Sequence, residues 1–326
     1  RLGLVITDEQ HRFGVMQRTA LSEKSGAAAP SPHVLVMSAT PIPRTLSFIL
    51  YGDLAISTLD ELPPGRQKID TFAVGESYRE RLDAFIRKTV LAGHRVYVVC
   101  PAVSPAEAKA DTEDEQLGDG EDQRQLHTAT ETAQRLASLF PDIPVGLVYG
   151  KMKSADKERA MADFAEGRTS ILVSTTVIEV GVNVPEATLM IIEDADRFGL
   201  SQLHQLRGRV GRGSEKSYCV LVSDNRSSEA RSRLEIMVRS NDGFAIAQRD
   251  LQLRGPGDFF PHAGGGARQH GAVDSELFSV GADEQAVEQA SRTAKALLDA
   301  DPMLEEQPAL RERVEQLMTV GINTIH

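Results

Sequence analysis

The stretch VGLVYGKMKSADKERAMADFAEGRTSILVSTT (145–176) decides the fold, because it has the pattern of a strand, a helix and a second strand. Its ends, VGLVYG (145–150) and TSILVSTT (169–176), are apolar runs of the kind found in strands that are buried on both faces of a parallel sheet. The residues between them, SADKERAMADFAEG (154–167), have a helical pattern. The stretch therefore predicts a βαβ unit.

The same alternation continues on both sides of this unit. Helical patterns at 77–94 and 132–140 are interleaved with apolar runs at 95–103, 187–194 and 217–224. We therefore expect an α/β fold, in which a parallel sheet carries helices on both faces.

The remaining parts of the chain have other patterns. Two strand-like runs, LGLVIT (2–7) and HVLVMSAT (33–40), come before ELPPGRQKI, whose Pro-Pro-Gly suits neither a helix nor a central strand. Residues 60–70 are therefore predicted to be an interdomain linker. At the other end, 226–254 predicts a pair of charged helices, and 282–326 an amphipathic helical tail with a break at Asp301-Pro302.

The net charge of −11 is unevenly distributed along the chain. Nine acidic residues face two basic ones between Ser104 and Glu131, and nine face four from Asp283 to the end. Between Arg197 and Lys216, in contrast, five basic residues face one acidic residue. The overall acidity therefore does not exclude a nucleic-acid partner, and the acidic stretch 104–128 is predicted to be a flexible surface insert.

Composition and cysteine placement indicate a cytoplasmic protein. The apolar runs are far shorter than the roughly 20 residues that cross a bilayer. Cys100 and Cys219 each lie within a strand-like run, so we expect buried free thiols in a reducing compartment.

Polar side chains follow the two strand-like runs at the beginning of the chain. Asp8 and Glu9 come directly after the first run, and Ser38 and Thr40 lie in the last three residues of the second. Two carboxylates at the carboxyl end of a parallel strand can divide labour, one binding Mg²⁺ and one activating water. Taken alone, each pattern is also an ordinary strand-end turn.

The strongest chemical signal is SQLHQLRGRVGRG (201–213). Glycines at 208 and 211 alternate with Arg207, Arg209 and Arg212, so the backbone can bend closely while guanidinium groups converge on one target. Guanidinium groups suit phosphate oxygens and stabilise the charge that develops in phosphoryl transfer. The alternative is a basic surface loop.

Four segments together resemble motifs II, III, V and VI of superfamily 2 helicases, in that order: DEQH (8–11), SATPIPRTL (38–46), TTVIEVGVNVP (175–185) and QLRGRVGR (205–212). More narrowly, DEQHRFGV, YGDLAISTLDELPPGR and EDADRFGLSQLHQLRGRVGRG resemble the RecG family of ATP-dependent helicases, which remodel branched DNA. The alternative within the superfamily is the translocase module of a transcription-repair coupling factor.

The resemblance implies a role for each matching residue. Asp8 would bind Mg²⁺, Glu9 would activate water, and Arg209 and Arg212 would be arginine fingers positioned by Gln205. The remaining motif residues would couple the nucleotide to DNA: His11, Ser38, Thr40, Thr176, Glu179 and Gly181. Asn183 departs from the family, which usually has aspartate at this position.

The segment NDGFAIAQRDLQLRGPGDFF, together with ARQHG, resembles the hairpin and hook with which RecG proteins translocate on DNA. The matching positions are Arg254, Gly255, Gly257, Arg268 and Gln269. PHAGGGA, within the hook region, departs from the family, which usually has a short Gly-Thr connection there.

No GxxxxGK[ST] phosphate loop occurs in the chain. The resemblance implies that this loop and a wedge domain precede the present residues, so the chain is expected to be an inactive C-terminal fragment of an enzyme. The intact protein is expected to be a monomeric ATP-dependent DNA helicase that uses ATP and Mg²⁺ on branched double-stranded DNA. A single-stranded DNA-binding protein is a further candidate partner. The alternative from another class is a non-catalytic DNA-binding or interaction module.

The resemblance also implies a domain organisation. We expect the end of a first RecA-like domain, a linker, a complete second RecA-like domain, a translocation hairpin with its hook, and a helical tail, at 1–59, 60–70, 71–225, 226–281 and 282–326. Because the first part holds only a portion of a sheet, we expect it to be poorly stable in this chain.

Overall fold

The computed structural model describes eight ranges of the chain: 3–8, 33–38, 57–59, 61, 66–102, 127–176, 184–254 and 284–322. The chain divides into two compact units, one comprising 1–41 with 61–246 and the other 42–60 with 247–326. Each unit is described by itself.

The main structure of the first unit is a six-stranded parallel sheet in the order β3-β8-β7-β4-β6-β5. The central strands are mostly apolar, and every residue of β6 and β7 is buried. This agrees with the predicted burial on both faces. The strands are β3 (Asp70–Val74), β4 (Arg95–Val99), β5 (Val145–Val148), β6 (Ile171–Ser174), β7 (Ala187–Ile192) and β8 (Tyr218–Val222).

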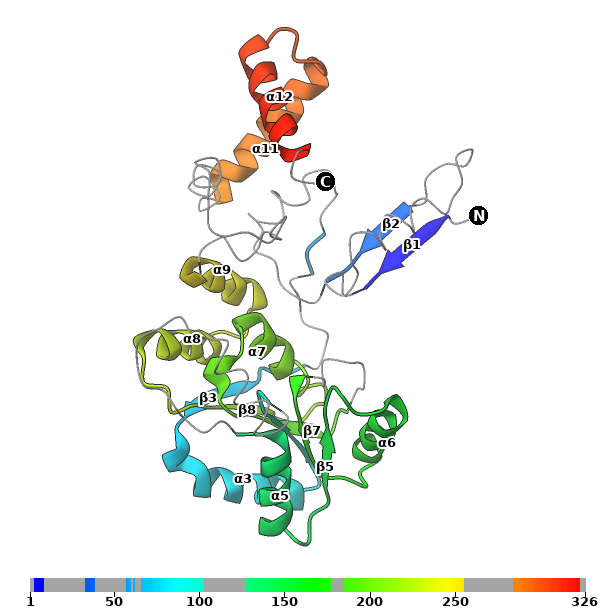
Figure 1. Ribbon diagram of the computed structural model, residues 1–326, viewed down its shortest axis with the longest axis vertical. Helices are drawn as coiled ribbons and strands as arrows, with labels where there is room; N and C mark the ends of the chain where they lie inside the picture. The colour runs from blue at the N-terminus through cyan, green and yellow to red at the C-terminus, as the bar shows by residue number, and fades with distance from the viewer. Residues whose placement is uncertain are drawn as a thin grey trace. The chain divides into compact units, whose positions relative to one another are not determined.

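Helices cover both faces of this sheet (Figure 1), as the sequence predicted. Alternate residues of each strand point to opposite faces, so Val96 and Val98 pack with α3 and α5, whereas Tyr97 and Val99 belong to the core under the other helices. One face carries α3 (Arg79–Leu91) and α5 (Ala129–Leu139); the other carries α6 (Ser154–Ala165), α7 (Leu200–Arg207) and α8 (Ser228–Arg239).

Two elements of this unit were not predicted. Strand β3 was missed because its sequence, DTFAV, lacks the continuous apolar run of the central strands. It lies at the edge of the sheet, and its Phe72 is half exposed. Helix α7 occupies the first part of the segment that was expected to act as a glycine-rich arginine loop.

The two strand-like runs at the beginning of the chain form a small parallel sheet of their own. Strand β1 (Leu4–Thr7) pairs with β2 (His33–Val36) in the register Thr7↔Val36. Their carboxyl ends therefore lie at the same edge.

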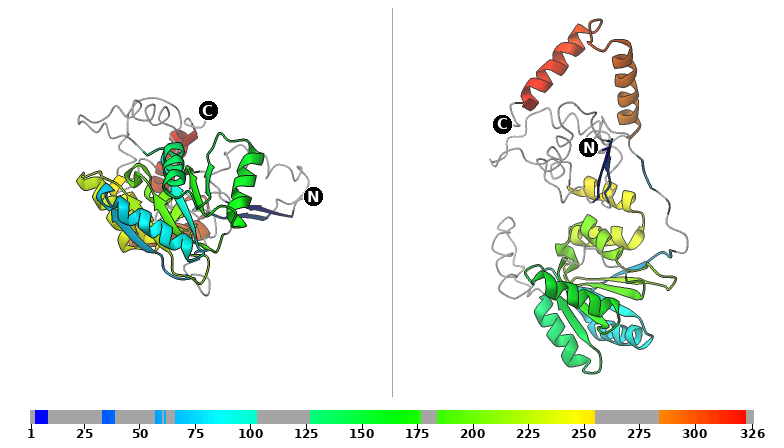
Figure 2. Two further views of the ribbon diagram at one scale, coloured as in Figure 1. Left: turned by 90° about the horizontal axis from the view of Figure 1, so that it is seen from below. Right: turned by 90° about the vertical axis from the view of Figure 1, so that its right-hand side faces the viewer.

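The expected pair of charged helices is present as α8 and α9 (Gly243–Arg254), and Figure 2 shows them from two further sides. Ser227 caps α8 by accepting a hydrogen bond from the Ala230 N–H, and Asp242 accepts one from the Phe244 N–H at the start of α9. The tail contains α11 (Glu284–Ala300) and α12 (Pro308–Ile322). The expected break between them is stabilised by the Asp301 carboxylate, which accepts hydrogen bonds from the Glu305 and Glu306 N–H groups.

The predicted burial of both cysteines as free thiols is confirmed. Cys100 and Cys219 are fully buried free thiols, and burial raises the pKa of Cys219 to about 12. Among the described helices, none has the length and apolar character needed to cross a membrane.

Candidate functional site

The arginine-rich segment consists of helix α7 and the loop that follows it. Leu200, Leu203 and Leu206 are fully buried and attach α7 to the sheet, while the Gln202 side chain accepts a hydrogen bond from the Gly199 N–H at the first turn. The helix ends at Arg207, and Gly208 is its C-cap. We call residues 208–214 the arginine loop.

Gly211 gives the arginine loop its sharp bend. Its φ of +72° lies in the left-handed region, and a Cβ at this position would lie 3.0 Å from Cγ1 of Ile69. The backbone conformation and the close contact both require glycine. The predicted close bending of the loop is therefore confirmed at Gly211, whereas Gly208 has an ordinary helical conformation.

The sequence led us to expect that the three arginines of the segment converge on one target. The structure shows that they do not. Arg207 is 2% exposed and points into the protein. Its Nη1 donates to the carbonyls of Met237 (2.9 Å) and Ser240 (2.8 Å), at the end of α8, and to Oγ1 of Thr71 (3.4 Å). Arg207 is thus a structural link between α7 and α8, while Arg209 and Arg212 remain on the loop.

The arginine loop has a strongly positive environment. The Arg212 Nε donates to the Gly208 carbonyl. Nearby His204 is mostly buried, and burial together with the charges of Arg207 and Arg66 lowers its pKa to about 4. His204 is therefore neutral at neutral pH, mainly because burial disfavours its charged form and secondly because of the two arginines. The positive charges of the arginines themselves favour an anion such as a phosphate nearby.

The structure brings together Asp8 and Ser38. They follow the paired strands β1 and β2, and the Met37 N–H donates to the Thr7 carbonyl at 2.8 Å, so both side chains belong to one edge of the small sheet. Both residues are exposed. Glu9, His11 and Thr40 lie outside the described residues.

Thr176 and the arginine loop lie at opposite ends of the parallel strands of the large sheet. Thr176 follows the carboxyl end of β6, whereas the loop precedes the amino end of β8. Gly213 is also close to the residues before β7, since a Cβ there would lie 2.8 Å from the Pro185 carbonyl oxygen. Gln205 lies on α7. Glu179, Gly181 and Asn183 are outside the described residues.

The predicted hook residues lie almost entirely beyond the described part. Arg254 is the last residue of α9, and Gly255, Gly257, Arg268 and Gln269 are outside the described ranges. The structure therefore shows the helical pair but not the hook.

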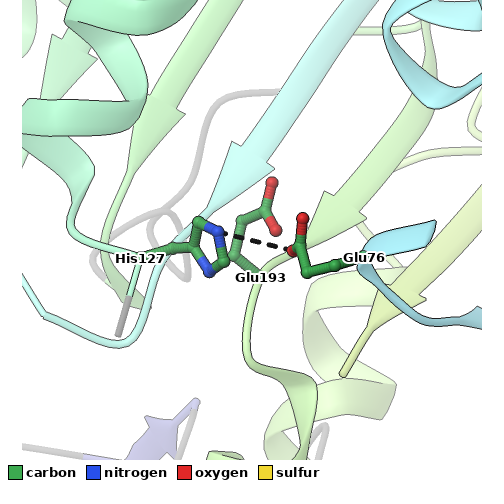
Figure 3. Close-up of side chains that lie close together, drawn as sticks. All are labelled: Glu76, His127 and Glu193. Atoms are coloured by element: carbon green, nitrogen blue, oxygen red, sulfur yellow. Dashed lines mark ion pairs between the residues drawn. The ribbon is translucent and has the colours of Figure 1, made fainter. Parts of the chain in front are cut away.

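A cluster that the sequence gave no reason to expect lies at the carboxyl edge of the sheet. Glu76, His127 and Glu193 come from three separate segments and lie close together (Figure 3). A histidine nitrogen and carboxylate oxygens can bind a metal ion. Here, however, Arg79 donates hydrogen bonds to the carboxylates of both Glu76 and Glu193, and those to Glu193 are 2.6 and 2.8 Å long. The cluster is therefore an ion-pair network.

His127 also connects this network to Asp194. The Asp194 carboxylate accepts a hydrogen bond from the backbone N–H of His127 at 2.7 Å and lies 3.1 Å from the His127 ring Nδ1. This contact with Asp194 raises the pKa of His127. The network holds the beginning of α5 against the end of β7. His127 and Thr128, at the end of the predicted insert, therefore belong to the ordered fold, and the Thr128 hydroxyl accepts a hydrogen bond from the Glu131 N–H.

Two protein families match the chain. The helicase conserved C-terminal domain matches residues 79–214, and domain 3, C-terminal, of the ATP-dependent DNA helicase RecG matches residues 240–324. The first match contains α7 and four of the six strands of the sheet, β4 to β7, and the second contains α9, α11 and α12.

Individual relatives agree with these family matches. The chain is 48% identical over 317 residues to the ATP-dependent DNA helicase RecG of Synechocystis and 42% identical over 322 residues to that of Bacillus subtilis. These alignments cover 97% and 98% of this chain, but 35% and 44% of the relatives. A solved structure of RecG bound to a three-way DNA junction is 41% identical, with a TM-score of 0.61, covering 80% of this chain and 31% of that one.

The fold and these matches define the class as RecA-like helicase C-terminal domains. More narrowly, the chain belongs to the RecG family and corresponds to its C-terminal portion. The match to RecG domain 3 favours this assignment over a transcription-repair coupling factor.

Proposed function

We propose that this chain is the C-terminal part of an ATP-dependent DNA helicase that remodels branched DNA. The observation that carries the proposal is the arginine loop: two arginines, Arg209 and Arg212, lie on a bent loop that α7 and Ile69 fix in place. In phosphoryl transfer, such guanidinium groups stabilise the charge that develops on the transferred phosphate. The phosphate loop that would bind ATP is expected in the remaining part of the full-length protein.

Magnesium would be bound on the small sheet. The carboxylate of Asp8 is exposed at the end of β1, and carboxylate oxygens are preferred Mg²⁺ ligands, so the residue fits this role. When bound, Mg²⁺ would neutralise charge on the nucleotide phosphates. Glu9 is the proposed general base, and Ser38 the proposed coupling residue at the same edge.

DNA would be engaged by the region after α7. The buried Arg207 joins α7 directly to the end of α8, so a shift of α7 and the arginine loop would also move the end of α8. Because one solved relative is a RecG bound to a three-way DNA junction, we propose branched DNA as the substrate here as well. We further propose that the enzyme is monomeric and cytoplasmic and that it has a single-stranded DNA-binding protein as a partner.

ATP hydrolysis by the full-length protein tests the role of the arginine loop. Arg209→Ala is expected to lower the kcat of DNA-stimulated hydrolysis by about 10³-fold or more, because arginine fingers contribute on this scale. Arg168→Ala is the matched control. Arg168 is an exposed arginine that pairs with Asp163 and Glu166 after α6, and its loss should leave hydrolysis unchanged.

The opposite result would support the alternative from the other class. A full-length protein that binds DNA equally well with and without ATP, and equally well with Arg209→Ala, would be a non-catalytic DNA-binding module. Hydrolysis that Arg209→Ala leaves intact would remove the proposed role of this loop while preserving the enzyme.

A further inference from the structure

The end of the linker lies along the arginine loop. Strands β3 and β8 are paired in the register Asp70↔Tyr218, and the Asp70 N–H donates to the Ser217 carbonyl at 3.1 Å. Because the strands are parallel, the residues that precede β3 run beside the residues that precede β8. These are residues 66–69, from the linker, and the arginine loop.

Three linker side chains contact the arginine loop along its length. The Arg66 Nη2 donates to the Gly208 carbonyl at 3.3 Å, and the Gln67 Nε2 donates to the Ser214 carbonyl at 2.7 Å. Between them, Ile69 is buried and leaves no room for a side chain at Gly211. The linker therefore contacts the first, middle and last residues of the loop that carries Arg209 and Arg212.

Arg66 also adds charge at this position. It shares the Gly208 carbonyl with the Arg212 Nε, so the two guanidinium groups are held near one another. Burial, together with the charge of Arg212, lowers the pKa of Arg66. Two cations at one acceptor repel each other, and an anion placed between them would relieve this repulsion.

We propose that Arg66 is a positioning residue which, with Gln67, fixes the arginine loop to the interdomain linker. The inference rests on the proposed function. A linker that moves when the two helicase domains close would move the loop with it, because the contacts are made to the loop backbone itself. Arg66 would thus help to bring Arg209 and Arg212 to the nucleotide, while the phosphate contacts are made by the loop arginines.

The test compares variants of the full-length protein. Arg66→Ala is expected to lower the kcat of DNA-stimulated ATP hydrolysis by about tenfold or more, because a hydrogen bond from a charged donor is lost, with little change in the KM for ATP. Arg66→Lys should recover part of the rate, since it retains the charge and a donor but not the planar group. Gln67→Ala should cause a smaller loss.

Lys68→Ala is the matched control, because Lys68 is an exposed cation between Arg66 and Ile69 in the same linker. Equal losses for Arg66→Ala and Lys68→Ala would show a general effect of linker charge and would overturn the proposal. A higher KM with an unchanged kcat would also overturn it, because Arg66 would then bind ATP directly.

Hydrogen exchange separates this proposal from the proposed function. In Arg66→Ala, the amides of residues 208–214 should exchange faster than in the wild-type protein, whereas Lys68→Ala should leave them unchanged. This result is independent of activity, so it would support the linker contact even if the wild-type protein hydrolysed no ATP. Unchanged exchange of the loop in Arg66→Ala would contradict the contact.

Discussion

At the scale of single residues, burial separates arginines that look equivalent in the sequence. Arg207 and Arg209 stand two positions apart in QLRGRVGR, yet Arg207 is buried and bonded to the end of α8, whereas Arg209 lies on the loop. The sequence could not reveal this difference, because the acceptors are backbone carbonyls, which every residue carries. The contacts of Arg66 and Gln67 were missed for the same reason.

Arg207→Met is expected to lower the free energy of unfolding of the first unit by about 2–4 kcal/mol, because the carbonyls of Met237 and Ser240 lose a charged donor in a buried site. Hydrogen exchange of β7 and β8, which are expected to open only when the unit unfolds globally, measures this energy. Arg231→Met, an exposed arginine on α8, is the control and should change it by less than about 0.5 kcal/mol. Equal stability of the two variants would show that Arg207 is not a structural link.

At the scale of secondary-structure elements, the sequence predicted the elements with strong apolar patterns. The central strands and the helices α3, α5 and α6 were predicted because continuous apolar runs and helical periodicity indicate them directly. Strand β3 was missed because it is an edge strand, and α7 because its eight residues precede a glycine-rich turn that dominated the pattern. The site was predictable only as residue types: Asp8 and Ser38 share an edge, but the position of the arginine loop before β8 depends on the three-dimensional pairing of the strands.

The small sheet is expected to be the least stable part of the first unit. Its apolar side chains are uncovered, with Leu4 54%, Ile6 58% and Val34 56% exposed. Burial of apolar surface is the main source of stability, so β1 and β2 should open easily. In this chain their amides should exchange much faster than those of residues 145–222. Equal protection of the two regions would contradict this expectation.

At the scale of the whole molecule, the chain covers less than half the length of the RecG relatives that it matches. It spans 35% and 44% of the RecG proteins of Synechocystis and Bacillus subtilis, and it matches the helicase C-terminal domain and RecG domain 3. The local basic charge around the arginine loop contrasts with the net charge of −11 for the whole chain. Net charge alone would therefore have been a poor guide to a nucleic-acid partner, and the distribution of charge is the better one.

The most direct test of the central claim is the rate of ATP hydrolysis by the full-length protein with a three-way DNA junction, compared with a linear duplex of the same length and base composition at equal salt concentration. We expect hydrolysis that depends on DNA and is stimulated several-fold more by the junction than by the linear duplex. Absence of hydrolysis with either DNA, or equal stimulation by both, would contradict a RecG-type enzyme that acts on branched DNA.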